Sequence, residues 1–281
     1  MLTNFLEIRV DKPDLIPSLK AVCAGYECGE WRSIALSRYL IRDCLLDFSL
    51  SAEEKAATTA ATAGHQLADA ATWLYNSPRY KARGEIGELL LHVVLKQFYG
   101  TRALITKIYF KDSPNDTVKG FDSVHVAGNE SNLELWLGEV KFYADATKAI
   151  SDVIGELQLH LQRDYLRTEF VAIKRKLPEN NDDGGLFERL TQRNVSLDAI
   201  FSRLCIPVLL TYNSDTVGAY NAVSAAFIST LEKEVDALFE KFQKKLPGLP
   251  ARVHLCLFPL GQKAALADAV HEVIRACQTL N

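Results

Sequence analysis

The sequence predicts an α/β protein in which helices flank a mixed β-sheet and a mostly helical region lies at the N-terminus. Residues 79–281 alternate between short β-type runs and helical stretches, which favours a sheet covered on both faces. Residues 1–78 place their apolar residues mostly at helical spacing. The chain has 281 residues, of which 48% are hydrophobic, so it can bury a sizeable core in one large domain or two small ones.

The N-terminal region is predicted to end at a proline. Residues 31–48 have apolar positions at helical spacing. Ser51-Ala-Glu-Glu54 is a capping box, which starts an Ala-rich helix that reaches Tyr75. Ser77-Pro78 then breaks the pattern. We therefore divide the chain into a helical region, residues 1–78, and a second domain, residues 79–281.

The second domain is predicted to open with one helix and three strands. That helix covers residues 80–99 and ends at Gly100, a residue typical of helix ends. Further helices are predicted over residues 145–167, 186–204, 219–246 and 263–280, and the apolar stripe of helix 219–246 is assigned to the core rather than to a partner. Strands are predicted over residues 103–110, 121–126, 133–142, 170–174, 206–212 and 252–258, with an acidic loop at 178–185.

Composition excludes several classes of protein. Lys and Arg number 32 against 35 Asp and Glu, so binding to a polyanion would need a local basic patch. None of the six cysteines has C-x-x-C spacing, which favours free thiols in a reducing cytosol. There is no apolar run of signal-peptide or membrane length and no phosphate-binding glycine loop. We therefore expect a cytoplasmic protein without a membrane or nucleotide partner of its own.

Two acidic residues and a lysine are predicted to meet on one face of the sheet. Glu139 and Lys141 are two positions apart on a strand, so they share a face. A hairpin centred between residues 130 and 131 pairs position i with 261 minus i, which sets Asp122 opposite Glu139. Cross-strand neighbours lie about 4.5–5.5 Å apart at Cβ, close enough to share one divalent cation. The plainer alternative is a surface ion pair between Glu139 and Lys141 on an edge strand.

Such a group fits hydrolysis of a phosphodiester. Mg²⁺ held by Asp122, Glu139 and a backbone carbonyl would relieve the repulsion between the carboxylates. Lys141 would position or deprotonate the attacking water, or stabilise the developing charge. The six histidines are scattered along the sequence, and each is interpreted as a structural or surface residue.

The helix before the first strand adds carboxylates and positive charge. Glu85 and Glu88 are three apart and neighbours on the helix surface, although acidic residues also suit a first turn by the helix dipole alone. Gly84 and Gly87 suggest the close approach of another backbone or a ligand. Residues 79–111 carry seven Lys and Arg against these two Glu, a local basic patch to which we assign three DNA-contacting residues, Lys81, Arg83 and Lys96.

The spacing of these residues resembles the PD-(D/E)xK nuclease superfamily. Its motifs G-x-x-x-E, D and E-x-K match Gly84 with Glu88, then Asp122, then Glu139 with Lys141. Phe121 stands where a proline usually precedes the aspartate. The resemblance implies a restriction-endonuclease-like fold, metal ligation by Glu88, Asp122 and Glu139, and a glutamine on the following helix that orients the site. Gln158 is the candidate, and Gln162 competes equally by spacing.

At finer grain, three segments resemble the HamA family, the nuclease subunits of the Hachiman anti-phage defence system. They are RGEIGELLLH, KGFDSVHV and LWLGEVKFY, and the resemblance spans roughly residues 79–260. It implies a cytoplasmic DNase that uses Mg²⁺, with Mn²⁺ as a substitute, and that a partner helicase, HamB, holds in check. Residues 1–78 match none of the nuclease motifs, so they either hold the partner or complete the core.

We therefore expect Mg²⁺-dependent hydrolysis of DNA, with Glu88, Asp122, Glu139, Lys141 and Gln158 in the site. Two other functions stay open. A nuclease-like binding module without activity would regulate a helicase, but the presence of all four key side chains argues against a relic. A restriction-type endonuclease acting alone would need a base-reading domain, which the sequence does not show.

Overall fold

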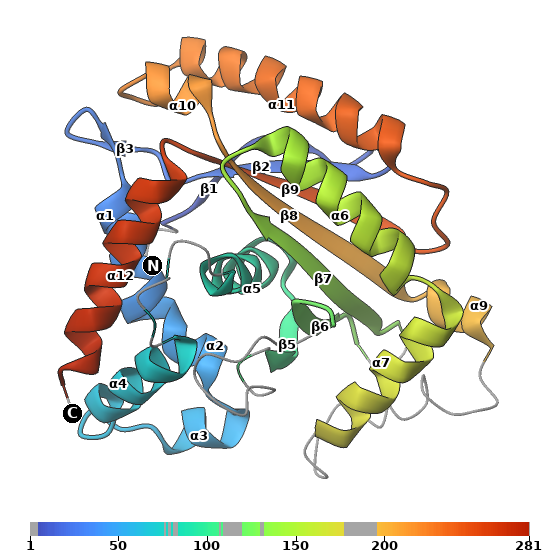
Figure 1. The fold of residues 1–281 in the computed structure, drawn as a ribbon, viewed down its shortest axis with the longest axis horizontal. Coiled ribbons are helices and arrows are strands. Elements are labelled where there is room, and N and C mark those ends of the chain that lie inside the picture. Colours follow the sequence, from blue (N-terminus) through green and yellow to red (C-terminus); the bar gives the residue numbers. More distant parts are fainter. Residues whose placement is uncertain are drawn as a thin grey trace.

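The computed structural model describes residues 5–75, 77, 80, 84–106, 108, 120–129, 132–176 and 196–280. Its centre is a seven-stranded sheet in the order β1-β2-β9-β8-β7-β6-β5, with helices on both faces (Figure 1). The strands of this sheet are β1 (Glu7–Lys12), β2 (Ser18–Cys23), β5 (Arg102–Thr106), β6 (Ser123–Ala127), β7 (Glu134–Phe142), β8 (Leu204–Asn213) and β9 (Arg252–Leu260). A small separate hairpin pairs β3 (Tyr26–Glu27) with β4 (Glu30–Trp31).

The sheet is mixed, as the sequence predicts. Its four central strands, β2, β9, β8 and β7, run parallel, while β1 at one edge and β6 and β5 at the other pair antiparallel. Central parallel strands are buried on both faces and need helical cover on each. The predicted α/β class, a mixed sheet flanked by helices, is therefore confirmed.

Each face of the sheet has its own hydrophobic core. One core lies under α6 (Ala146–His160), α7 (Arg163–Lys176), α9 (Leu197–Phe201), α10 (Asp215–Ala219) and α11 (Ala225–Lys245). The other lies under α1 (Ser33–Arg38), a π-helical segment η1 (Tyr39–Cys44), α2 (Leu45–Ser49), α4 (Ala63–Leu74), α5 (Glu85–Tyr99) and α12 (Lys263–Gln278). Alternation along β7 sends Leu135 and Leu137 to the first core, and Trp136, Val140 and Phe142 to the second.

The prediction that residues 1–78 are mostly helical is wrong for their first third. β1 and β2 extend the main sheet, and β2 pairs with β9 from Ser18 opposite His254 to Ala21 opposite Leu257. The run from Ser18 to Cys23 has only six residues and alternates between partly buried and buried positions only from Ser18 to Ala21, which is a weak signal in sequence. One sheet thus contains strands from both sides of the proposed boundary at residue 78.

The helical part of the N-terminal region follows the sequence more closely. The capping box at Ser51 is present, and it starts α3 (Ala52–Ala57). The helix predicted to run from there to Tyr75 is interrupted, because Thr58 is extended and α4 begins only at Ala63. The helices α1, α2 and α4 line the second core, and α1 and α4 both pack against α12.

Two further predictions need correction. The predicted strand 170–174 lies inside α7, because Leu166, Phe170 and Ile173 recur at helical spacing and are buried together. The predicted helix 145–167 is divided into α6 and α7 at Leu161. The acidic loop 178–185 and most of helix 186–204 lie outside the described residues, and the part described contains α9 followed by β8 from Leu204.

Other elements agree with the sequence. α5 ends at Gly100, which has a φ of 61°, the left-handed conformation that suits glycine. α11 directs its apolar stripe, Phe227 to Phe242, into the core as predicted. The six cysteines form no disulfide. Within the described residues, no helix has the length and hydrophobicity needed to cross a membrane.

Candidate active site

The β6–β7 hairpin has the register that the sequence predicts. Val124 pairs with Leu137 and Val126 with Leu135, each pair summing to 261. β6 begins one residue after Asp122, and the Asp122 amide donates to the Gly138 carbonyl at 2.8 Å. Asp122 therefore lies beside Glu139, at the end of the hairpin that is remote from its turn.

The backbone of β7 fixes the Asp122 side chain. Its Oδ2 accepts a hydrogen bond from the Val140 amide at 2.8 Å. Because β6 has ended, this amide would otherwise have no strand partner, so the carboxylate completes the hydrogen bonding at the strand edge. Val140 lies between Glu139 and Lys141, so the bond holds the Asp122 carboxylate next to both.

Glu139 is almost fully buried, with 1% of its surface exposed, and contacts a histidine from α6. His160 Nδ1 and Glu139 Oε1 are 2.5 Å apart. Burial lowers the pKa of His160, so the imidazole is neutral and its Nδ1–H donates to the carboxylate. The ring of Tyr165 stacks on the imidazole at 4.5 Å, and Phe121 meets it edge-on at 5.2 Å, which fixes its orientation.

Lys141 forms an ion pair with Glu156, also on α6. Burial acts to lower the pKa of Lys141, but the bond to Glu156 and the charges of Glu156, Asp122 and Glu139 outweigh it, so the pKa is raised. Lys141 is therefore an ammonium group. It can donate hydrogen bonds to a negatively charged oxygen, which favours charge stabilisation over removal of a proton from water.

We call Asp122, Glu139, Lys141, Glu156 and His160 the β7 cluster. Sequence reasoning missed its two α6 members. Glu156 and His160 are four residues apart, so they share one face of the helix. Gln158, the predicted orienting residue, lies between them in sequence and is exposed, and the structure does not bring it to the cluster. The E-x-x-x-H spacing on the helix after E-x-K is the signal that would have identified both.

Glu85 and Glu88 lie on α5, which covers the other face of the sheet. A Cβ on Gly87 would stand 2.9 Å from Phe142 Cβ and 3.0 Å from Val140 Cγ2, so the glycine permits α5 to approach β7 closely. The first turn of α5 is thus level with the part of β7 that carries Glu139 and Lys141. Participation of Glu88 in the site stays a prediction.

The predicted basic patch is described only in part. Lys81 and Arg83 lie outside the described residues. Lys96, on α5, forms an ion pair with Asp47, whose other oxygen lies 2.8 Å from Lys55 Nζ. Its ammonium already has an acidic partner, so a phosphate would have to compete with Asp47.

The donor chemistry suits a hard cation. Asp122 and Glu139 present carboxylate oxygens on one face of the sheet, and such oxygens are the ligands that Mg²⁺ prefers. Across the described residues, no three His, Cys, Asp or Glu side chains are placed to hold a metal ion. Two protein carboxylates are nonetheless enough for Mg²⁺, which usually keeps several waters.

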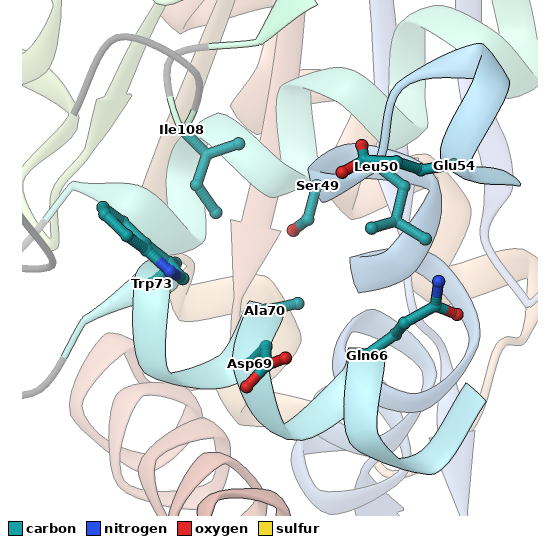
Figure 2. A pocket seen from close by; sticks show the side chains of 8 residues that line it. All are labelled: Ser49, Leu50, Glu54, Gln66, Asp69, Ala70, Trp73 and Ile108. Carbon is teal, nitrogen blue, oxygen red and sulfur yellow. The ribbon is translucent and has the colours of Figure 1, made fainter. Parts of the chain in front are cut away.

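A pocket of about 570 Å³ lies away from this cluster. Figure 2 shows it between the end of α2, the start of α3 and the side of α4 that carries Gln66, Asp69 and Trp73. It contains no predicted site residue. This pocket and the candidate chemistry therefore do not coincide, and the choice of site rests on the grouping of charged side chains.

Comparison with known proteins identifies the family. No curated protein matches the chain. The HamA family model matches residues 1–274, which include the two N-terminal strands as well as the β7 cluster. The match thus extends through the whole sheet rather than starting at residue 79. The chain belongs to the HamA family, anti-phage defence proteins of the Hachiman system.

Proposed function

We propose that this chain is a metal-dependent nuclease that hydrolyses the phosphodiester bonds of DNA. The observation that carries the proposal is the meeting of Asp122, Glu139 and Lys141 in the predicted register on one buried face. Burying two carboxylates side by side is costly unless a cation binds them. The lysine beside them is charged, as stabilisation of a phosphorane-like oxygen requires.

Asp122 and Glu139 would hold Mg²⁺, with Mn²⁺ as a substitute, and Glu88 would help to hold this ion or a second one. The bound ion would polarise the phosphate and lower the pKa of the attacking water. Lys141 would donate to a non-bridging phosphate oxygen. His160 fixes the carboxylate of Glu139, and Glu156 holds Lys141 in place.

Incubation of the purified protein with DNA tests the proposal. Linear and circular duplexes are each treated with Mg²⁺, with Mn²⁺ and with EDTA. We expect cleavage with either metal and none with EDTA, and cleavage of the circle would identify an endonuclease. Intact DNA under all conditions, both for the protein alone and for its complex with HamB, would favour the inert binding module instead.

The proposal extends to control by a partner helicase, HamB, in the cytoplasm. An unregulated DNase would damage its own cell, and the sequence has no motif for binding a nucleoside triphosphate. We assign the partner surface to residues 1–78, where Ile34 on α1 is 60% exposed. This exposed apolar side chain is a position at which a substitution can test the surface.

Point variants test the partner surface better than a truncation at residue 80. Such a truncation would remove β1 and β2 from the main sheet. We expect Ile34→Glu to reduce the capture of HamB. Ile228→Glu changes an exposed isoleucine on α11, on the other face of the sheet, and should capture HamB normally. Equal capture of HamB by both variants would show that the interface does not include Ile34 on α1.

A further inference from the structure

A second pocket, of about 390 Å³, lies where the β3–β4 hairpin meets the loop before α11. Figure 1 shows this hairpin beside α10, at the end of the molecule where α11 begins. The pocket is bounded by Arg9 of β1, by Arg32 after β4, and by residues 221–223. Pockets of this size accept small molecules, for which roughly 300–1,000 Å³ is usual.

Two arginines line this pocket, and each has an unpaired donor within the described residues. Arg9 Nη1 lies 2.7 Å from Glu7 Oε2, so one part of that guanidinium is paired. The Nε atoms of Arg9 and Arg32 are both buried and have no hydrogen-bond partner within the described part of the chain. A buried N–H without an acceptor is costly, and two arginines with unpaired donors beside one pocket favour a ligand that accepts hydrogen bonds.

The charge of the pocket favours an anion. Among its lining residues, two arginines stand against one carboxylate, Glu7. The Arg32 guanidinium lies 4.1 Å from the ring centre of Phe5, and this contact holds it without neutralising it. The N-terminus of the 21-residue helix α11 follows directly after Val223 and adds positive potential.

We propose that this pocket binds the phosphate group of a phosphate monoester. Each guanidinium offers a planar fork of donors that matches the oxygens of a phosphate. The three terminal oxygens of a monoester can accept from both forks at once, whereas a carboxylate has only two oxygens. Gly25 also lines the pocket, and a Cβ there would lie 3.9 Å from Arg9 Nη2. Because Gly25 has no side chain, the backbone on this side of the pocket leaves the guanidinium uncovered.

The pocket is separate from the candidate nuclease site. It adjoins the end of β2, and β9 and β8 lie between β2 and β7. At about 4.8 Å per strand, β2 and β7 are roughly 14 Å apart. Binding can therefore be measured without DNA cleavage, and failure of one proposal leaves the other standing.

Calorimetry and thermal unfolding of the full chain test the site, with inorganic phosphate, AMP and acetate as probes at constant ionic strength. We expect saturable binding of AMP and phosphate with a raised melting temperature, and no comparable effect of acetate. Arg32→Lys keeps the charge but removes the fork, and it should weaken AMP binding by about tenfold or more. Arg275→Gln removes an exposed arginine on α12 and should leave binding unchanged.

Oligonucleotides with a 5′-phosphate or a 5′-hydroxyl distinguish the source of the monoester. Binding of the phosphorylated oligonucleotide in preference to AMP would place the end of a DNA strand in the pocket, and the reverse would indicate a free nucleotide. The proposal fails if no probe binds saturably, if acetate binds as well as phosphate, or if a folded Arg32→Lys protein binds AMP as tightly as the wild type.

Discussion

Two polar clusters, one on each face of the sheet, contain the same kinds of residue, and each includes a buried histidine. The β7 cluster lies under α6. The Asp47 cluster, Asp47, Lys55, His92 and Lys96, connects α2, α3 and α5 on the other face. In both, burial lowers the pKa of the histidine, which is therefore neutral. They differ in the balance of formal charge.

In the Asp47 cluster one carboxylate receives two ammonium groups and a histidine. Burial acts to raise the pKa of Asp47, but the hydrogen bonds from His92, Lys55 and Lys96 outweigh it and hold the pKa well below its usual range. The described part of the β7 cluster has three carboxylates, Asp122, Glu139 and Glu156, for one lysine. The comparison teaches that an excess of carboxylates over cationic side chains, rather than the residue types, distinguishes a cation site from a structural cluster.

The largest effects are expected at Glu139 and Lys141. Glu139→Gln removes the charge of a metal ligand but can still accept from His160, and Lys141→Ala removes the donor to the phosphate. Each should lower DNA cleavage by about 10²–10³-fold or more, and Asp122→Asn should behave like Glu139→Gln. Single-turnover cleavage with Mg²⁺ provides the measurement.

A lysine on α6 supplies the control for these variants. Lys148 is exposed and pairs with Asp152, so Lys148→Ala should leave cleavage within about twofold of the wild type. Near-normal cleavage by Glu139→Gln or Lys141→Ala, with an unchanged melting temperature, would remove the β7 cluster as the active site.

The next effect is expected at His160, which acts by positioning Glu139. His160→Ala should lower metal affinity or the cleavage rate by roughly 10–100-fold, the usual range for a residue that orients a ligand. His160→Asn places an amide N–H near the position of Nδ1 and should retain most activity, whereas His160→Gln should not. Titration of Mg²⁺ in the cleavage assay separates affinity from rate.

Gln158→Ala is the matched variant on the same helix. Because Gln158 is exposed, its loss should matter less than the loss of His160. A larger effect at Gln158 would restore the role that the sequence predicts and would make the contact between His160 and Glu139 merely structural.

The hairpin register was predictable because local chemistry determines it. Residues 128–132 are polar and turn-forming, and both flanking runs alternate, so only one pairing buries Val124, Val126, Leu135 and Leu137 together. The α6 residues were not predictable to the same degree. Glu156, Gln158 and Gln162 are all polar positions on the helix predicted over residues 145–167, and only the packing of α6 over β7 decides which of them faces the sheet.

Errors in the fold have a related cause. β2 alternates only over its first four residues, so its period-two signal is weak, and its place depends on pairing with β9, more than 200 residues away. Residues 170–174 include β-branched and apolar residues and so resemble a strand when taken alone. Leu166, which is buried on the same side of α7 as Phe170 and Ile173, precedes these five residues. In the first case a contact distant in sequence determines the structure, and in the second a helical repeat that extends beyond the five residues does so.

A smaller effect, on stability rather than cleavage, is expected at Asp47. Asp47→Ala leaves the buried Nε2 of His92 without its partner and should lower the free energy of unfolding by about 1–3 kcal/mol at pH 7. Because the folded pKa of Asp47 is lowered, its contribution is present above the unfolded value of 3.8 and is lost as the pH falls below it. Urea unfolding at pH 7 and pH 3 should therefore show a smaller difference in the free energy of unfolding between the wild type and Asp47→Ala at pH 3. An equal or larger difference at pH 3 would contradict the assignment. Cleavage by the folded variant should be unchanged.

The smallest effect is expected at Lys96, and it tests whether the Asp47 cluster has any part in DNA binding. Lys81 and Arg83, if they contact phosphates, should each contribute about 0.9 to the slope of log Kd against log salt concentration, for DNA of any sequence. Lys96 is held by Asp47, so Lys96→Gln should change that slope far less than the double variant Lys81→Gln/Arg83→Gln. The slopes are measured with EDTA on two unrelated duplexes. If Lys96→Gln alone lowered the slope by about 0.9, Lys96 would leave Asp47 to bind a phosphate. The Asp47 cluster would then take part in DNA binding as well. A change confined to one duplex would instead show that these residues contact bases.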